Sequence, residues 1–186
     1  MKYTWVQYDD VITKAQCKQL IEAGKTNGLY DAKINDEGTD KPDYYDPDVR
    51  NCQLAKIPFQ QLLWMEDLLS EALSEINFSN YNFDLVGFSD LQMIEYNKGT
   101  YFKRHLDNFL GAPEYQRKLS FIFQLTDPDE YVGGDLIVYT YEKEERMTRK
   151  QGSLIVFPSY TMHEVTEVLS GTRHSLIGWV LGPDFK

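Results

Sequence analysis

The sequence predicts a mainly β protein in which N-terminal helices pack against an antiparallel β-sandwich or jelly roll. Residues with helical spacing are confined to the first half of the 186-residue chain. The second half is a series of short β segments at the spacing typical of sandwiches and jelly rolls. The length fits one domain, with helical support over about 9–81 and a β core over about 82–182.

Two helices are expected before the β segments. The first covers residues 13–25, with Thr13 as its N-cap. The second runs from about Pro58 to Ile76 and opens with Pro58 in its first turn. Its apolar residues recur with a 3.6-residue period and form a wide face, so we expect this helix to pack on a sheet.

The region between the helices, from Tyr30 to Asp48, is polar and acidic and contains Pro42, Pro47 and Gly38. These residues predict a long surface loop, and residues 30–48 are expected to form either a disordered loop or a mobile lid over a substrate-binding site. The two cysteines, Cys17 and Cys52, have no CxxC spacing and are expected to be buried reduced thiols.

Turn residues separate the expected strands. A short strand over 49–54 precedes seven others in the second half of the chain, which we place at 88–96, 101–107, 118–126, 134–141, 153–157, 163–168 and 173–181. Gly133 and Gly134 are expected only to form a turn that leads into a strand, and residues 142–146 a solvated hairpin tip.

Composition excludes several functions. Hydrophobic residues make up 42% of the chain, which argues against disorder, and no apolar run approaches the ~18 residues that span a bilayer. The start of the chain lacks the apolar segment of a secretory signal, so we expect a cytoplasmic protein without a membrane partner. The net charge of −10 argues against binding to duplex nucleic acid.

Three residues of the β half could hold a metal ion. His105 and Asp107 are two positions apart on a predicted strand and should therefore share a face. His163 begins another predicted strand, which a jelly roll could bring alongside the first. Two imidazoles and one carboxylate make the facial triad that suits Fe(II), although zinc is an alternative for the same ligands.

Arg173 favours iron over zinc. It begins a strand shortly after His163 and shares a strand face with Ser175 and Trp179, whereas His174 should point to the opposite side. A guanidinium beside a metal is expected if a dicarboxylate cosubstrate has its other end on the metal. We expect Trp179 to be a core residue and His174 to be an exposed or sheet-packing histidine.

Five segments in this order resemble the Fe(II)- and 2-oxoglutarate-dependent oxygenases, and within them the prolyl 4-hydroxylase-like branch with its PKHD-type hydroxylases. The resemblance covers about residues 90–179, with its segments at 96–107, 119–125, 133–136, 152–158 and 163–175. It implies a double-stranded β-helix, or jelly roll, with the N-terminal helices packed on one sheet.

The resemblance also implies the roles of individual residues. His105, Asp107 and His163 would bind Fe(II), and Arg173 and Tyr96 would hold the distal carboxylate of 2-oxoglutarate. Ser120 lies where relatives often place a hydroxyl near the cosubstrate. No catalytic residue beyond the metal centre is implied, and ascorbate is a candidate reductant.

The implied activity is a dioxygenase that hydroxylates an unactivated carbon with dioxygen, most simply of a prolyl or other residue in a protein or peptide. One alternative is a small-molecule or nucleic-acid oxygenase with the same chemistry. Another is a cupin-like jelly roll that binds zinc or a sugar. The sequence leaves the substrate and the oligomeric state open.

Overall fold

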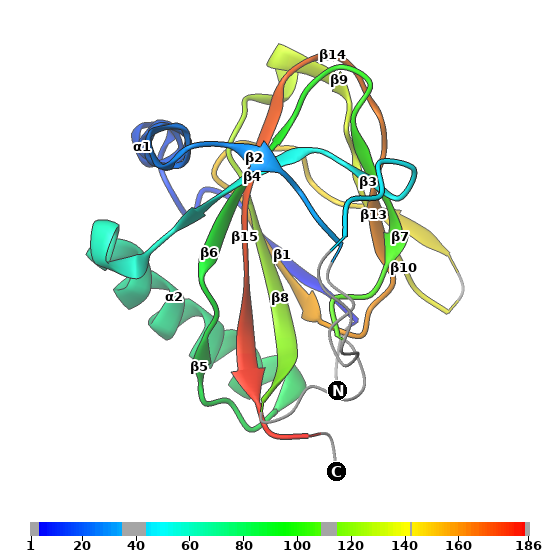
Figure 1. Ribbon diagram of the computed structural model, residues 1–186. Helices are drawn as coiled ribbons and strands as arrows, with labels where there is room; N and C mark the ends of the chain where they lie inside the picture. The colour runs from blue at the N-terminus through cyan, green and yellow to red at the C-terminus, as the bar shows by residue number, and fades with distance from the viewer. Residues whose placement is uncertain (1–3, 35–43, 109–114, 142, 185–186) are drawn as a thin grey trace.

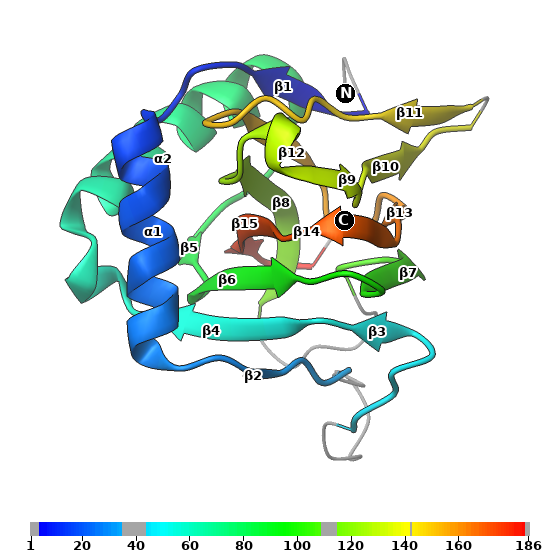
Figure 2. The ribbon, with the colours of Figure 1, turned by 90° about the horizontal axis from the view of Figure 1, so that it is seen from above.

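The protein is built in three layers. The computed structural model describes residues 4–34, 44–108, 115–141 and 143–184. Two helices cover the outer face of the larger β-sheet, and a smaller sheet faces the other side of that sheet (Figures 1 and 2). This is the predicted jelly roll with helices packed on one sheet.

Helix α1 spans Lys14–Asn27 and begins as predicted at Thr13. The Thr13 Oγ1 accepts a hydrogen bond from the Gln16 amide at 3.2 Å, and the Gln16 side chain accepts one from the Thr13 amide at 2.8 Å. This capping box satisfies amide donors that would otherwise lack partners at the helix start. The buried face of α1 contains Cys17, Leu20 and Gly24.

Helix α2 spans Leu63–Ile76, so the prediction that Pro58 opens this helix was wrong. Pro58 has an extended backbone and precedes a single 3₁₀ turn, Phe59–Gln61. Leu62, with φ −142° and ψ 56°, then separates the turn from the α-helix. The predicted apolar face does pack on the sheet, through the buried residues Met65, Leu69, Leu73 and Ile76.

Within the described residues the larger sheet contains eight strands, and most of its pairs join segments far apart in the chain. Their spatial order is β1 (Val6–Tyr8), β12 (Leu154–Pro158), β8 (Gln116–Gln124), β15 (Arg173–Gly182), β6 (Leu91–Tyr96), β4 (Gln53–Ile57) and β2 (Tyr30–Asp31), with β5 (Gly87–Phe88) paired to one end of β15. All of these pairs are antiparallel.

The smaller sheet contains five strands in the part of the chain that the structure describes. Their order is β11 (Glu144–Arg146), β10 (Leu136–Tyr139), β13 (His163–Val165), β7 (Tyr101–His105) and β3 (Arg50–Asn51). A separate pair, β9 (Tyr131–Gly133) with β14 (Val168–Gly171), lies at one end of the jelly roll (Figure 1).

Side-chain alternation on the larger sheet separates two cores. Leu176 and Val180 of β15 face the helices and join the outer core. Ile177 packs against the inner core between the sheets, and Arg173 and Trp179 line a cavity there. Because β15 lies near the middle of the sheet, its inward residues are well shielded from solvent.

Several predicted strands are divided or shortened in the structure. The expected strand at 163–168 is two strands, β13 and β14, because β14 turns away to pair with β9. The segment expected at 134–141 starts only at Leu136. Residues 144–146, expected in a hairpin tip, form the edge strand β11.

The predicted loop at 30–48 contains ordered structure that the sequence analysis missed. Tyr30 and Asp31 pair with β4, and Ile34 forms an isolated bridge with Tyr44. Residues 35–43, nearly half of the segment proposed as a loop or lid, lie outside the described residues.

Both cysteines are buried and free, as predicted. Burial raises the pKa of the Cys17 thiol to about 11, and it also raises that of Cys52. In the described ranges, no helix is long and apolar enough to cross a membrane.

Candidate metal centre

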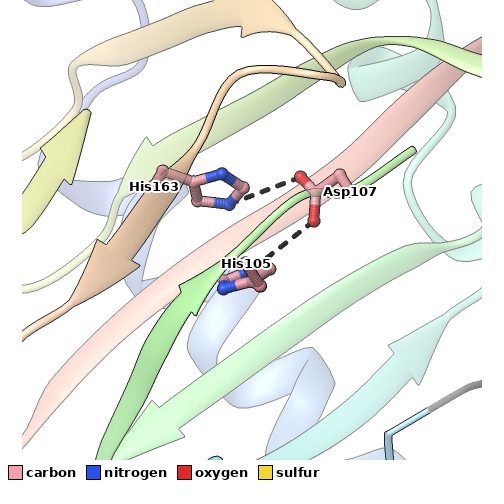
Figure 3. Close-up of side chains that lie close together, drawn as sticks. All are labelled: His105, Asp107 and His163. Atoms are coloured by element: carbon pink, nitrogen blue, oxygen red, sulfur yellow. Dashed lines mark ion pairs between the residues drawn. The ribbon is translucent and has the colours of Figure 1, made fainter. Parts of the chain in front are cut away.

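His105, Asp107 and His163 converge at one end of the jelly roll. His105 ends β7 and His163 begins β13, and the two residues are direct partners in this antiparallel strand pair. The His105 Nε2 lies 3.6 Å from one Asp107 carboxylate oxygen, and the His163 Nε2 lies 3.5 Å from the other (Figure 3). The three donor atoms lie within 4.8 Å of one another.

Asp107 reaches this position by a bend and not by strand alternation, so the prediction that β7 includes it was wrong. The strand ends at His105, and the Asp107 amide then donates to the Ser159 carbonyl at 2.9 Å. The Ser120 hydroxyl of β8 donates to the Asp107 carboxylate at 2.7 Å. Contacts from two other segments therefore fix Asp107, one through its backbone and one through its side chain.

Both imidazoles direct Nε2 toward Asp107. The His105 Nδ1 lies 2.7 Å from the Lys103 carbonyl, and the His163 Nδ1 lies 2.9 Å from the Thr161 carbonyl. A carbonyl only accepts, so each Nδ1 carries the proton and each Nε2 keeps its lone pair. Lone pairs directed at a common point beside a carboxylate are the donor set that a divalent metal requires.

His163 and Asp107 are in the protonation states that ligate metals. Burial lowers the pKa of His163 to about 4, and the neighbouring His105 adds to this effect, so His163 is neutral near pH 7. For Asp107, burial opposes ionisation, but His163 and His105 together hold its pKa well below the usual range. The carboxylate is therefore charged at neutral pH.

Arg173 is a buried cation without a carboxylate partner among the described residues. Its side chain is only 1% exposed and lines the same cavity as the triad. One terminal nitrogen donates to the Gln124 side chain at 2.8 Å, and the other lies 3.4 Å from the Ser175 hydroxyl. Its Nε has no acceptor in the described ranges. A buried guanidinium in this state is suited to bind an anion.

Gly134 makes room for Arg173, a function that the sequence analysis did not assign. Its φ is 63°, and an added Cβ would lie 2.8 Å from Val168 and 3.1 Å from the Arg173 Cδ. The prediction of a positive-φ turn at Gly133 and Gly134 is confirmed, and the turn also shapes the cavity.

Tyr96 lies beside Arg173 on the neighbouring strand β6, and the two residues are direct partners. The Arg173 guanidinium lies 5.3 Å from the centre of the Tyr96 ring. The Tyr96 side chain is buried, and burial raises the pKa of its hydroxyl, which remains protonated and able to donate. Its hydroxyl could therefore assist Arg173 in holding an anion.

The cavity that contains these groups has a volume of about 520 Å³. Trp179, expected as a packing residue, also lines it while being 5% exposed. Two arginines that the sequence analysis did not single out, Arg50 and Arg117, line it as well. Their positions depend on pairing between distant strands, so no local motif could have identified them.

His174 points away from this cavity, as its alternation with Arg173 predicts. Its ring nitrogens lie 3.0 Å from the Glu95 carboxylate and 3.1 Å from the Thr126 hydroxyl. His174 is thus a packing residue on the helix side of the sheet.

Comparison with known families agrees with this geometry. Residues 91–181, nearly half of the chain, match the sequence model of the 2OG-Fe(II) oxygenase superfamily. These residues are similar to a 2OG-Fe(II) oxygenase domain. The superfamily uses Fe(II) and 2-oxoglutarate, and the matched residues include the triad, Tyr96 and Arg173. The donor set described above fits these cofactors.

The chain is also similar to curated and solved proteins. A PKHD-type hydroxylase from Prochlorococcus marinus is 40% identical over 84 residues, which is 45% of this chain and 38% of that relative. The match thus spans less than two-fifths of the relative's length.

Solved structures share the fold. A prolyl-4-hydroxylase from Pseudomonas putida has a TM-score of 0.77 at 20% identity, with coverage of 98% of this chain and 94% of that chain. A prolyl hydroxylase from Trichoplax adhaerens, in complex with a peptide fragment of the hypoxia inducible factor oxygen degradation domain, also gives 0.77, at 14% identity, over 96% of this chain and 84% of that chain.

Proposed function

We propose that this protein is an Fe(II)- and 2-oxoglutarate-dependent hydroxylase that acts on a residue of a protein or peptide. The observation that carries the proposal is the convergence, in one cavity, of the His105–Asp107–His163 donor set and the buried Arg173. A metal ligand set alone would also suit zinc, but the buried arginine needs an anion.

In this proposal His105, Asp107 and His163 hold Fe(II). The two neutral imidazoles and the carboxylate offer three ligands from one side and leave positions for other ligands. The hydrogen bonds of Ser120, Lys103 and Thr161 orient the ligand side chains without occupying their metal-facing atoms.

Arg173 and Tyr96 hold the distal carboxylate of 2-oxoglutarate. The guanidinium offers charged N–H donors and the phenol one further donor, and both are shielded from water. Gln124 and Ser175 keep the guanidinium in place. When bound, Fe(II) and 2-oxoglutarate supply the oxidation of an unactivated carbon by dioxygen, while the protein orients its ligands and excludes water.

The relatives favour a peptide substrate. The similar proteins are PKHD-type and prolyl hydroxylases, and one of the solved structures contains a peptide. The cavity of about 520 Å³ can admit a single side chain of a peptide beside the cosubstrate.

A turnover assay tests the proposal. The protein, with Fe(II), 2-oxoglutarate and dioxygen, should convert 2-oxoglutarate to succinate, and a proline-containing peptide library should gain the mass of one oxygen. Alanine at His105, Asp107 or His163 should abolish turnover and iron binding. His174→Gln is the matched control because His174 lies on the other face of the sheet. A triad variant with normal iron content and turnover would refute the assignment.

A further inference from the structure

The described residues that line the cavity carry a net positive charge, although the whole chain has a net charge of −10. Among the described residues that line it, five are cationic and only Asp107 is a carboxylate. The proposed function accounts for one of the cations, because Arg173 is balanced by the cosubstrate. The proposed function assigns no role to the other four, which are Lys33, Arg50, Lys56 and Arg117.

Arg50 is separated from the proposed metal ligand His105 by the ring of Phe102. Its guanidinium lies 4.6 Å from the centre of the Phe102 ring, and the Phe102 ring stacks on the His105 ring with centroids 3.5 Å apart. One terminal nitrogen donates to the Lys33 carbonyl at 3.2 Å. The Arg50 Nε is buried and has no acceptor among the described residues, so this guanidinium retains a donor for a ligand.

Arg117 flanks another ligand of the triad. Its guanidinium donates to the Asp107 carbonyl at 3.3 Å and lies 3.8 Å from the centre of the Trp179 ring. An aromatic face holds a guanidinium in a fixed plane, and a fixed plane suits the two-pronged binding of a carboxylate. Arg50 and Arg117 are therefore two half-buried guanidiniums, each oriented by an aromatic ring beside the metal centre.

Lys33 and Lys56 are more exposed and extend the positive charge outward from the cavity. Lys56 lies 3.8 Å from Asp90, but both side chains are more than half exposed, and such pairs contribute little. Positive charge concentrated at a cleft in an otherwise acidic protein attracts anions specifically to that cleft.

We propose that the substrate is an acidic peptide, with a carboxylate side chain within one or two residues of the hydroxylated residue, and that Arg50 and Arg117 bind this carboxylate. The inference rests on the proposed function, because it concerns the substrate of the same site. The net charge of −10 of the whole chain would by itself favour a cationic peptide, whereas the cavity favours an acidic one.

Peptide binding tests this proposal independently of turnover. The protein is loaded with Mn(II) and 2-oxoglutarate, and three peptides are compared that carry a central proline flanked on both sides by Glu, Gln or Lys. Mn(II) broadens the proton NMR signals of bound peptides, so each affinity is measured without any reaction. We expect the Glu peptide to bind at least tenfold more tightly than the Gln peptide, and the Lys peptide to bind least.

Two variants test whether Arg50 and Arg117 produce the preference for the Glu peptide. Arg50→Met and Arg117→Met should each reduce the Glu-over-Gln ratio severalfold, and Arg50→Lys should retain part of it. Arg104→Met is the matched control, because Arg104 also stacks on an aromatic ring, that of Tyr139, but lies outside the cavity. The Glu-over-Gln affinity ratio of the Arg104→Met protein should equal that of the unmodified protein.

The outcomes separate the two proposals. Equal binding of the three peptides, no binding by any, or a preference for Lys would overturn the acidic-peptide inference even if 2-oxoglutarate turnover is normal. A Glu preference that persists in both arginine-to-methionine variants would overturn the assignment to these residues. A Glu preference without any 2-oxoglutarate turnover in the Fe(II) protein would leave the inference on binding intact and refute the proposed hydroxylase.

Discussion

At the scale of single residues, the site depends on a side chain that is not itself a metal ligand but orients one. Ser120 donates its only proton to Asp107, and its oxygen lies 3.0 Å from the Ser159 hydroxyl, which can donate in turn. Ser120 is buried in β8 of the larger sheet, so the sheet fixes the orientation of the carboxylate. The predicted position of Ser120 near the cosubstrate therefore has a different consequence: it orients a metal ligand.

Ser120→Ala should weaken Fe(II) or Mn(II) binding by about 10- to 100-fold, because removal of a hydrogen bond to a metal ligand commonly has this effect. Metal titration monitored by calorimetry measures the change. Ser120→Thr keeps the hydroxyl and is the matched control. Identical metal affinities in the alanine variant and the unmodified protein would show that Asp107 is oriented by its backbone alone.

Arg173→Ala should weaken 2-oxoglutarate binding much more than metal binding. Loss of a buried charge-assisted pair costs about 2–4 kcal/mol, or ~30- to 1,000-fold in affinity. Lysine at this position should restore part of the affinity, since it returns the charge but not the planar fork. Calorimetry on the metal-loaded variants measures both constants, and unchanged affinity for 2-oxoglutarate would exclude Arg173 as its anchor.

At the scale of elements, α1 sits very close to the larger sheet because Gly24 has no side chain. A Cβ at this position would lie 2.4 Å from the Met93 Cε and 2.8 Å from its Cβ on strand β6. The close approach places α1 against the strand that ends at Tyr96, so helix packing supports the cosubstrate side of the site.

Gly24→Ala should destabilise the protein although alanine is the better helix former. Alanine gains about 1 kcal/mol of helix propensity, but overpacking against β6 typically costs about 1–3 kcal/mol, and the backbone-proximal Met93 Cβ cannot move away. Urea unfolding measures the difference. Gln19→Ala on the exposed face of α1 is the control and should have little effect; a stabilised Gly24→Ala protein would contradict the close packing.

Sequence patterns predicted these elements where the pattern is local. The capping residue of α1, the long strands β8 and β15, and the alternation that separates Arg173 from His174 all follow from spacing within one segment. The predicted start of α2 was wrong because a proline such as Pro58 fits either the first turn of a helix or the extended residue before that turn. The short strands β2 and β11 carry too few residues for any period and exist only through their partners.

The candidate site was predicted to a similar degree. Histidines and aspartate in a recognisable order identified the triad, yet the bend at Asp107 depends on Ser159 and Ser120, which are distant in sequence. Arg50 could not be assigned because its role arises from a stack with Phe102 and His105 across strands β3 and β7.

At the scale of the whole molecule, the metal-free protein should lose stability as the pH falls from 7 to 5. Burial lowers the pKa values of His163, to about 4, and of His174, so the unfolded chain binds protons that the folded chain excludes. The contribution of these histidines to the free energy of unfolding is complete above about pH 6.5, the pKa that histidine has in the unfolded chain. It declines below that pH, by on the order of 1–2 kcal/mol at pH 5.

Urea unfolding at a series of pH values tests this dependence. His174→Gln removes one of the two groups and should make the decline shallower, whereas a substitution at an exposed lysine such as Lys18→Gln should leave its slope unchanged. Stability that rises on acidification would show that the histidines are protonated in the folded state.

The two sheets contribute different halves of the site. The histidines of the triad belong to β7 and β13 of the smaller sheet, whereas Tyr96 and Arg173 belong to β6 and β15 of the larger one. In the proposed function, a metal held by one sheet and a dicarboxylate anchored in the other form a noncovalent cross-link through the interior. Either group alone would leave the sheets free to separate at this end. Together they would fix the width of the opening before a peptide arrives, so the binding of the cofactors would also set the shape that the substrate meets.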